Sequence, residues 1–443
     1  MIGVKKAAGL GLALLTGLTL FAGCGETSLA IESTVGEITG GVEGLLAPPR
    51  LSEEQNAIYD ALSSHLSGQS MRLVYPQEGE NLSAFTLCEL DGTEGGEAVV
   101  FYEPSSASAA SPVKMAVLDQ REEGWQVADD FTLEGSGVQD LSILTLIDGP
   151  AFGVGLDYAG DSGSNLLCLY RLEGEEVRQN GAFTFQEKSI GDFTGDGIDD
   201  LLLLYTADDP VGQSSAQAGL FRWQEEEGFV EIDSCPVNPD MGRYERLLAA
   251  DEDGQARFYL DGYRGNTMVT EVIRLTKDTL ENETISLGEY PQRPGLLSMD
   301  VNGDGLVEIP SQEPLPGYTG EEAPLYLTRW YRLEEGEYHP VWSGYVNSQF
   351  SYQFIFPEEW EGKVTVQWNQ TTNEAVFIQM EDGYPLFSLR AVPVSDWLAG
   401  KYPGYQQLLE RGQTVFLMRM VTGTGDCALS AAEIRERFGD LSG

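Results

Sequence analysis

The stretch GDFTGDGIDDLLLLY, from Gly191 to Tyr205, places an oxygen-rich loop directly before a run of leucines. Its candidate metal ligands are spaced two residues apart and are Asp192, Thr194, Asp196, Ile198 (through its carbonyl oxygen) and Asp200. Glycines at 195 and 197 allow a tight turn. Alternate oxygens on so short a loop converge on one point, as a calcium ion requires. The apolar run that follows predicts a buried strand.

The same pattern recurs further along the chain in DVNGDGLVEI. There the candidate ligands are Asp300, Asn302, Asp304, Leu306 (through its carbonyl oxygen) and Glu308. A weaker copy spans Glu89–Glu97, with Thr93 where the central aspartate belongs, so we do not expect this copy to bind metal. The alternative interpretation of the two stronger loops is a metal-free Asp-Gly turn. An EF-hand is excluded, because no amphipathic helices flank the loops.

An internal repeat organises the chain from residue 71 to about 345. Hairpin turns with flanking strand patterns are expected at 123–124, 173–174, 227–228, 277–278 and 335–336. Acidic loops precede most of these turns, and the spacing of the units is about 52 residues. A unit of this size holds a four-stranded sheet that buries its faces only by stacking on its neighbours. Radial stacking predicts a mainly β fold, a degenerate β-propeller with five recognisable units and five to seven blades.

The loop-and-strand units at 192–205 and 300–309 resemble FG-GAP/VCBS repeats, which occur in integrin α-chain propellers and many bacterial surface proteins. In that family the loop holds calcium within a blade and stiffens it. The resemblance therefore implies structural calcium at both loops, rather than a catalytic metal.

The N-terminus reads as a targeting segment. Lys5 and Lys6 precede an apolar run that is too short to span a membrane comfortably. The sequence Leu20-Phe21-Ala22-Gly23-Cys24 resembles the lipobox of bacterial lipoproteins, in which the cysteine is acylated and becomes the mature N-terminus. The resemblance implies a membrane-anchored protein of the bacterial cell envelope, with lipidation at Cys24. The alternative is an ordinary signal peptide.

The predicted organisation has five parts. These are a signal peptide at 1–23, lipidated Cys24 with a flexible tether at 24–50, a helix at 51–68, the propeller at 69–345 and an α+β domain at 346–443. In the last part we expect strands at 363–368, 374–380, 386–391 and 414–420, a helix over 405–411 and a short helix after Ser430. Aromatic residues at 360, 368, 397, 402 and 405 form either core packing or a carbohydrate platform.

Charge and motif content narrow the classes of function. The 71 acidic residues outnumber the 26 basic ones, for a net charge of −45, which disfavours nucleic acid as a partner. The sequence contains no GxSxG, HExxH or Walker motif. Cys88, Cys168, Cys235 and Cys427 are isolated in the sequence, which argues against a zinc or redox site but leaves a long-range disulfide open.

Two functions remain. The first is a non-catalytic, calcium-stabilised binding module for a protein or a glycan, held at the membrane by its lipid. The second is a secreted carbohydrate-active enzyme, a hydrolase or lyase that uses carboxylates. Clustered carboxylates with raised pKa values inside the propeller favour the enzyme, and acids confined to the loops favour the binding module.

Overall fold

A computed structural model describes residues 51–91, 96–105, 112–157, 165–208, 214–320, 324–421 and 426–441. Glu53–Gly443 form one compact unit, and the description below concerns this unit alone. The expected signal peptide, Cys24 and the tether lie outside the described residues. No helix in the described ranges combines the length and hydrophobicity needed to cross a bilayer.

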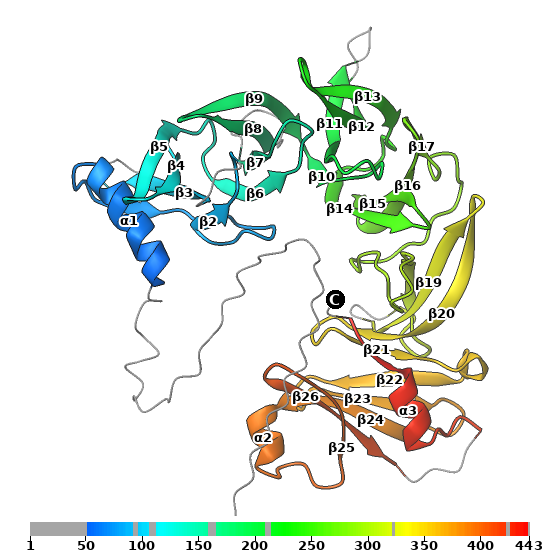
Figure 1. The fold of residues 1–443 in the computed structure, drawn as a ribbon. Coiled ribbons are helices and arrows are strands. Elements are labelled where there is room, and N and C mark those ends of the chain that lie inside the picture. The colour runs from blue at the N-terminus through cyan, green and yellow to red at the C-terminus, as the bar shows by residue number, and fades with distance from the viewer. Residues whose placement is uncertain are drawn as a thin grey trace, which may run out of the picture. The chain divides into compact units, whose positions relative to one another are not determined.

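The unit is mainly β, as predicted, and its strands form antiparallel sheets that follow one another along the chain (Figure 1). Sheet 1 contains β1 (Met71–Leu73), β2 (Phe85–Cys88), β3 (Glu97–Pro104), β4 (Lys114–Arg121) and β5 (Gly124–Thr132). Sheet 2 contains β6 (Val138–Leu144), β7 (Ala151–Leu156), β8 (Asn165–Glu173) and β9 (Glu176–Phe185). Sheet 3 contains β10 (Glu187–Gly191), β11 (Asp200–Asp208), β12 (Ser214–Gln224) and β13 (Gly228–Pro236).

Three further sheets complete the described fold. Sheet 4 contains β14 (Arg243–Glu252), β15 (Gln255–Arg264), β16 (Thr267–Thr276) and β17 (Thr279–Asn282). Sheet 5 contains β18 (Ile309–Pro314), β19 (Tyr326–Glu334), β20 (Glu337–Asn347), β21 (Tyr352–Ile355) and β27 (Phe438–Asp440). Sheet 6 contains β22 (Val364–Asn369), β23 (Glu374–Gln379), β24 (Tyr384–Pro393), β25 (Gln406–Arg411) and β26 (Thr414–Met420).

All five expected hairpin turns join neighbouring antiparallel strands. They lie between β4 and β5, β8 and β9, β12 and β13, β16 and β17, and β19 and β20. In the last of them Glu335 and Gly336 have φ values of 50° and 78°. Positive φ at both central residues is what a two-residue hairpin turn requires, and it suits the twist of the flanking strands.

The acidic loops occupy a constant place in the repeat. The loop at 192–199 joins the first two strands of sheet 3, and the turn at 225–227 joins its last two. In sheet 5 a bridge between Met299 and Glu308 closes the loop at 300–307, directly before β18. In an antiparallel meander the first and third connections lie at the same end of the sheet. The acidic loop and the hairpin turn of one sheet therefore lie at the same end of that sheet.

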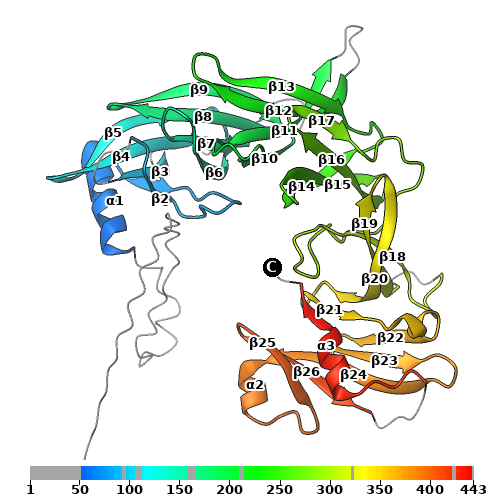
Figure 2. The ribbon, with the colours of Figure 1, turned by 45° about the vertical axis from the view of Figure 1, so that its right-hand side comes forward.

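The hydrophobic core is a series of layers, each shared by two consecutive sheets. Buried pairs that represent the five layers are Phe101 with Phe152, Leu167 with Leu203, Leu220 with Phe258, Tyr259 with Ile309, and Phe354 with Phe377. Both ribbon views show the sheets succeeding one another in chain order (Figure 2). Four-stranded antiparallel meanders packed in this way are the building units of β-propellers.

The helix expected over 51–68 is present as α1 (Glu53–His65), and its buried residues Ile58 and Leu62 lie one turn apart. The short helix α3 (Ala431–Arg437) also forms. It begins with a capping box between Ser430 and Glu433. The strands expected in sheet 6 are present, with shifts of one or two residues at some ends and a longer β24.

The prediction of a helix over 405–411 is wrong, because residues Gln406–Arg411 of this segment form strand β25. Its glutamine, leucine and glutamate residues favour a helix. However, Gly412 has a φ of 55° and turns the chain so that Arg411 pairs with Thr414. The hydrogen bonds to β26 then decide the conformation. The second helix in this part of the chain is instead α2 (Val394–Leu398).

The expected boundary between residues 345 and 346 falls inside β20. Beyond it, β21 pairs with β20 on one side and with β27 on the other. Arg411 of sheet 6 reinforces this arrangement by donating hydrogen bonds to the carbonyl of Phe350 and the carboxylate of Asp440. Sheets 5 and 6 are thus joined through a shared core and a returning strand. The division into two domains stays a prediction.

The aromatic residues near the C-terminal end pack into the core. Trp360 is 1% exposed, and Trp368, Trp397, Tyr402 and Tyr405 pack against the hydrophobic clusters of sheet 6. Cys88, Cys168, Cys235 and Cys427 are all free thiols. Burial, the largest cause, raises the pKa of Cys88 and of Cys235 to about 12 each, which keeps both thiols protonated.

Candidate functional site

The first acidic loop is folded by its own backbone amides. Asp192 accepts hydrogen bonds from the amides of Gly195 (2.7 Å), Asp196 (3.1 Å) and Gly197 (2.8 Å). The Oδ1 atom of Asp196 accepts another from the amide of Ile198, at 2.9 Å. The positive φ values of the two glycines, 75° and 82°, make these contacts possible. Thr194 lies exposed at the tip.

Asp200, the last acid of this loop, is buried with a side chain that is only 1% exposed. Its Oδ1 atom accepts a hydrogen bond from Nε of Arg222 at 3.2 Å, whereas its buried Oδ2 atom has no hydrogen-bond partner among the described residues. Burial raises the pKa of Asp200 to about 6 against the opposing effect of Arg222, and the charges of Asp196 and Asp192 raise it further. The carboxylates of Asp192, Asp196 and Asp200 therefore act on one another.

The second loop has the same backbone arrangement. Asp300 accepts hydrogen bonds from the amides of Gly303 (2.7 Å) and Gly305 (2.8 Å), and Asp304 accepts one from the amide of Leu306 at 3.0 Å. The side-chain amide of Asn302 donates to Oδ2 of Asp304 at 3.1 Å.

The last acid of the second loop, Glu308, has a different environment from Asp200. It is fully buried, and its Oε1 atom accepts hydrogen bonds from Nε and Nη2 of Arg332 at 2.8 and 2.6 Å. Its Oε2 atom accepts one from the amide of Val301 at 3.1 Å. Arg332 also donates to Asp304. Both carboxylate oxygens of Glu308 are therefore satisfied by the protein.

The two loops differ in how well they fit a metal ion. No group of three or more His, Cys, Asp or Glu side chains in the described ranges is already gathered as a metal would need. The first loop keeps an unsatisfied buried oxygen on Asp200, which suits a hard cation. The second loop keeps none on Glu308.

Residues 92–95 of the weaker copy lie outside the described residues. At its end Glu97 is fully buried, and one oxygen accepts a hydrogen bond from the amide of Leu90. The other oxygen has no partner within the described part of the chain. Burial raises the pKa of Glu97 to about 7.

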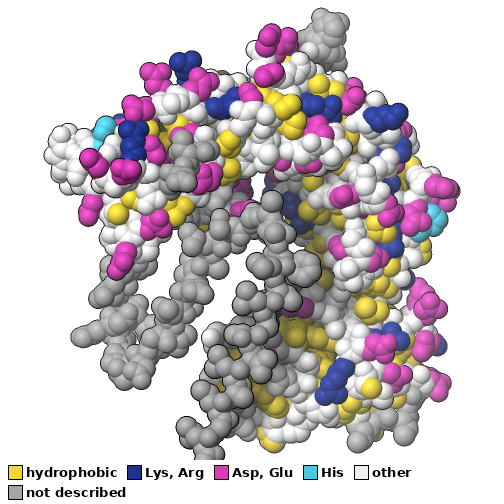
Figure 3. All heavy atoms as spheres, viewed as in Figure 1, with side chains coloured by type: hydrophobic (Ala, Val, Ile, Leu, Met, Phe, Trp, Pro, Cys, Tyr) yellow, Lys and Arg dark blue, Asp and Glu magenta, His cyan; other side chains and the backbone are white. Residues whose placement is uncertain are grey.

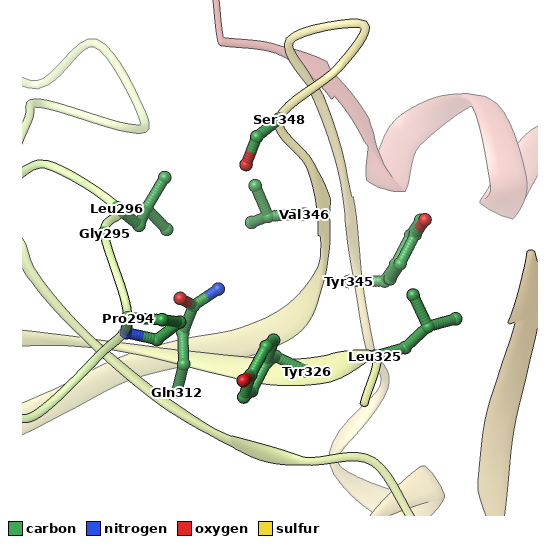
Figure 4. A pocket seen from close by; sticks show the side chains of 9 residues that line it. All are labelled: Pro294, Gly295, Leu296, Gln312, Leu325, Tyr326, Tyr345, Val346 and Ser348. Atoms are coloured by element: carbon green, nitrogen blue, oxygen red, sulfur yellow. The ribbon is translucent and has the colours of Figure 1, made fainter. Parts of the chain in front are cut away.

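A pocket of about 360 Å³ opens beside sheet 5, and no residue of either acidic loop lines it (Figure 4). Its lining consists of Pro294, Gly295, Leu296, Gln312, Leu325, Tyr326, Tyr345, Val346 and Ser348. Figure 4 shows the segment 294–296 on one side and residues of β19 and β20 on the other. Thr328 accepts a hydrogen bond from Gln312 at 3.0 Å, and Asn347 donates one to the Tyr345 hydroxyl at 3.1 Å. These two bonds hold polar lining groups in place.

Sequence reasoning missed this pocket. Its lining is uncharged and comes from segments spread over residues 294–348. No spacing rule connects such residues. The pairing of β18, β19 and β20, and the hydrogen bond from the Gln312 amide to the Gln292 carbonyl, bring them together.

A second group of titratable residues lies on the first strands of sheets 2, 3 and 4. On β10, burial raises the pKa of Glu187 to about 7, and the charges of Glu78 and Glu245 raise it further, against Lys188. Next to Glu187, Lys188 forms an ion pair of 2.6 Å with Asp140 of β6. Not all perturbed carboxylates are therefore in the acidic loops.

The face of the molecule in Figure 3 carries acidic side chains scattered among basic and apolar ones. Many arginines in the described ranges are engaged with carboxylates, including Arg171 with Asp148 at 2.6 Å and Arg257 with Glu252 at 2.9 Å. These pairs offset part of the acidic charge locally.

No known protein family matches the chain, and no curated protein is detectably similar. Several solved structures are distantly similar. The crystal structure of Saccharomyces cerevisiae Sqt1 has a TM-score of 0.33 and 10% identity, over 77% of this chain and 96% of that one. Rhamnogalacturonan lyase PL11 of Bacillus licheniformis has a TM-score of 0.30 and 12% identity, over 71% and 76%.

The periplasmic gluconolactonase PpgL of Pseudomonas aeruginosa has a TM-score of 0.28 and 13% identity, over 71% of this chain and 94% of that one. At these values the similarities assign neither a family nor an activity to this chain.

Proposed function

We propose that the protein is an extracytoplasmic lipoprotein of the bacterial cell envelope, anchored through lipidated Cys24. Its propeller, with FG-GAP/VCBS-like units and five to seven blades, acts as a calcium-stabilised, non-catalytic binding module for a protein or glycan. The observation that carries the proposal is the uncharged pocket in sheet 5.

The pocket has the chemistry of a binding site for a neutral ligand. Leu296, Leu325 and Val346 supply apolar surface, and Tyr326 and Gln312 supply an aromatic ring and an amide. A few fixed polar groups in an otherwise apolar cavity orient a ligand without reacting with it. A sugar ring, with an apolar face and polar edges, matches this combination.

Binding is tested on the full-length protein in detergent, with neutral oligosaccharides immobilised on an array. The Tyr326→Ala variant is expected to lose at least tenfold in affinity for any oligosaccharide that the wild type retains. Tyr384→Ala serves as the control, because Tyr384 is 51% exposed and lies outside the pocket lining. Equal binding by wild type and Tyr326→Ala would remove the pocket from the proposal.

Anchoring is tested separately. Bacteria that express the protein are grown in medium that contains labelled palmitate. The wild type is expected to carry the label in the membrane fraction, and the Cys24→Ala variant is expected to carry none. Label on both proteins, or on neither, would refute lipidation at Cys24.

Glu187 favours the alternative, a secreted carbohydrate-active enzyme. A carboxyl with a pKa of about 7 is suited to act as a general acid or base near neutral pH. The test incubates the protein with polysaccharides and measures new reducing ends. Release that is lost in Glu187→Gln would establish the enzyme and overturn the non-catalytic role.

Calcium stabilisation is tested by thermal unfolding in calcium and in chelator. Calcium bound only by the folded protein raises the melting temperature by mass action. The Asp196→Ala variant is expected to lose most of this gain. An unchanged melting temperature at millimolar calcium would eliminate the structural metal.

A further inference from the structure

We infer that the two acidic loops are neutralised by different cations: the loop at 192–200 by a divalent metal ion, and the loop at 300–308 by the guanidinium of Arg332. The first half rests on the proposed calcium stabilisation. The second half goes beyond it, because the sequence pattern implies metal at both loops.

The inference starts from two arginines in equivalent positions. In sheet 3, Leu201 of β11 pairs with Phe221 of β12, which places Asp200 across from Arg222. In sheet 5, Ile309 of β18 pairs with Tyr331 of β19, which places Glu308 across from Arg332. Each loop therefore ends on a buried acid that faces an arginine on the strand paired with the one after the loop, β12 beside β11 and β19 beside β18.

Arg332 lies against the predicted ligands of the second loop. Its guanidinium contacts both Asp304 and Glu308, two of the predicted ligands, and is held in place with a side chain only 20% exposed. Glu308 accepts three hydrogen bonds in all, two of them from Arg332. A divalent ion at this point would have to displace a cation that already satisfies the buried charge.

Arg222 also contacts a carboxylate of the next sheet, Asp278. Its Nη1 atom donates to Asp278 at 2.7 Å, and Asp278 belongs to the hairpin turn between β16 and β17. Only Nε reaches Asp200, at 3.2 Å, and Nη2 has no partner in the described ranges. One guanidinium is thus shared between two carboxylates of different sheets.

The consequence of this sharing is the orphaned Oδ2 atom of Asp200. A buried carboxylate oxygen without a partner is costly. A hard divalent ion that reaches Asp200 and Asp196 satisfies it, and carboxylate oxygens are the ligands that calcium takes. The first loop gains from a metal what the second already obtains from Arg332.

The first experiment counts calcium ions bound to the full-length protein in detergent, by equilibrium dialysis. The expected stoichiometry is one per chain, falling to zero in Asp196→Asn and staying at one in Asp304→Asn. Two ions in the wild type would overturn the role of Arg332 and leave the calcium-stabilised module intact. No bound calcium would refute both the metal at the first loop and the proposed calcium stabilisation.

The second experiment removes the internal cation. The Arg332→Gln variant is expected to bind two calcium ions per chain in place of one. Its melting temperature is expected to be low in chelator and to rise when calcium is added. Arg329→Gln, on the same strand but paired with Glu313 and Glu361, is the matched control and should still bind one. A stable Arg332→Gln protein that binds a single ion would overturn the inference.

A third variant tests the other half without touching either loop. Asp278→Asn removes the competing carboxylate, so Arg222 is free to satisfy Asp200 more fully. Calcium affinity is expected to fall about tenfold, as a gained charge-assisted hydrogen bond replaces a metal contact. Unchanged calcium affinity in a folded Asp278→Asn protein would refute the idea that Asp278 and Asp200 share Arg222. This test gives an answer even if Arg332→Gln fails to fold.

Discussion

Replacing Glu97 with glutamine is expected to remove a pH-dependent loss of stability from sheet 1. Glu97 lies on β3 and is fully buried. Burial is the largest cause that raises its pKa from 4.5 to about 7, and the charges of Asp91, Glu89 and Asp119 add to it. The folded state therefore favours the protonated carboxyl.

The magnitude follows from the shift. A carboxyl whose pKa is raised on folding contributes its full stability below pH 4.5 and loses it as the pH rises through 7. Between pH 5 and pH 8 the loss amounts to about 2.5 kcal/mol. Glutamine has no charge to bury, and its side-chain oxygen still accepts the hydrogen bond from the amide of Leu90.

The assay is urea unfolding of wild type and Glu97→Gln at pH 5 and pH 8. The advantage of the variant should be about 2.5 kcal/mol larger at pH 8 than at pH 5. Glu123→Gln, in the exposed turn of the same sheet, is the control and should show no such difference. An advantage for Glu97→Gln that is equal at both pH values would refute a buried, protonated carboxyl at this position.

Three further outcomes are expected at neutral pH, two in chemical unfolding and one in hydrogen exchange. Phe377→Ala removes a fully buried ring between sheets 5 and 6 and should cost about 3–5 kcal/mol, whereas the half-exposed Tyr384→Ala should cost under about 1 kcal/mol. Arg293→Met strips the fully buried Asp261 of an ion pair and should cost roughly 3–5 kcal/mol, of which Asp261→Leu in the same chain should restore most. Ser430→Ala removes the cap of α3 and should speed hydrogen exchange in that helix by about fivefold, with Ser430→Asp close to wild type. An Arg293→Met protein with the same free energy of unfolding as wild type would contradict the role of the ion pair. The same rate of hydrogen exchange in Ser430→Ala and Ser430→Asp would contradict the role of the cap.

Local chemistry made much of the fold predictable. The five hairpin turns and the acidic loops depend on glycines and acidic residues next to one another in sequence, as at Glu335 and Gly336. The strands beside them follow from apolar runs such as Leu201 to Leu204, all buried in sheet 3. The mainly β fold was therefore within reach of the sequence.

What the sequence could not show depends on partners distant in the chain. Residues 406–411 have helical propensity and become a strand only because β26 offers hydrogen bonds. The pocket in sheet 5 is lined by uncharged residues that no motif marks. The different environments of Asp200 and Glu308 arise from Asp278, which belongs to another sheet and engages one arginine of an otherwise matched pair.

Because strand β27 is made last, the edge of sheet 5 that it covers stays unpaired through most of the synthesis of the C-terminal part of the chain. Sheet 5 has its edge strand β21 when residue 355 has been made, but the partner of that edge follows only after all of sheet 6. An unpaired edge with open amide and carbonyl groups is a template for joining other chains. Until residues 438–440 have been made, the growing chain therefore exposes the open edge of β21, and a truncation just before β27 would make that exposure permanent.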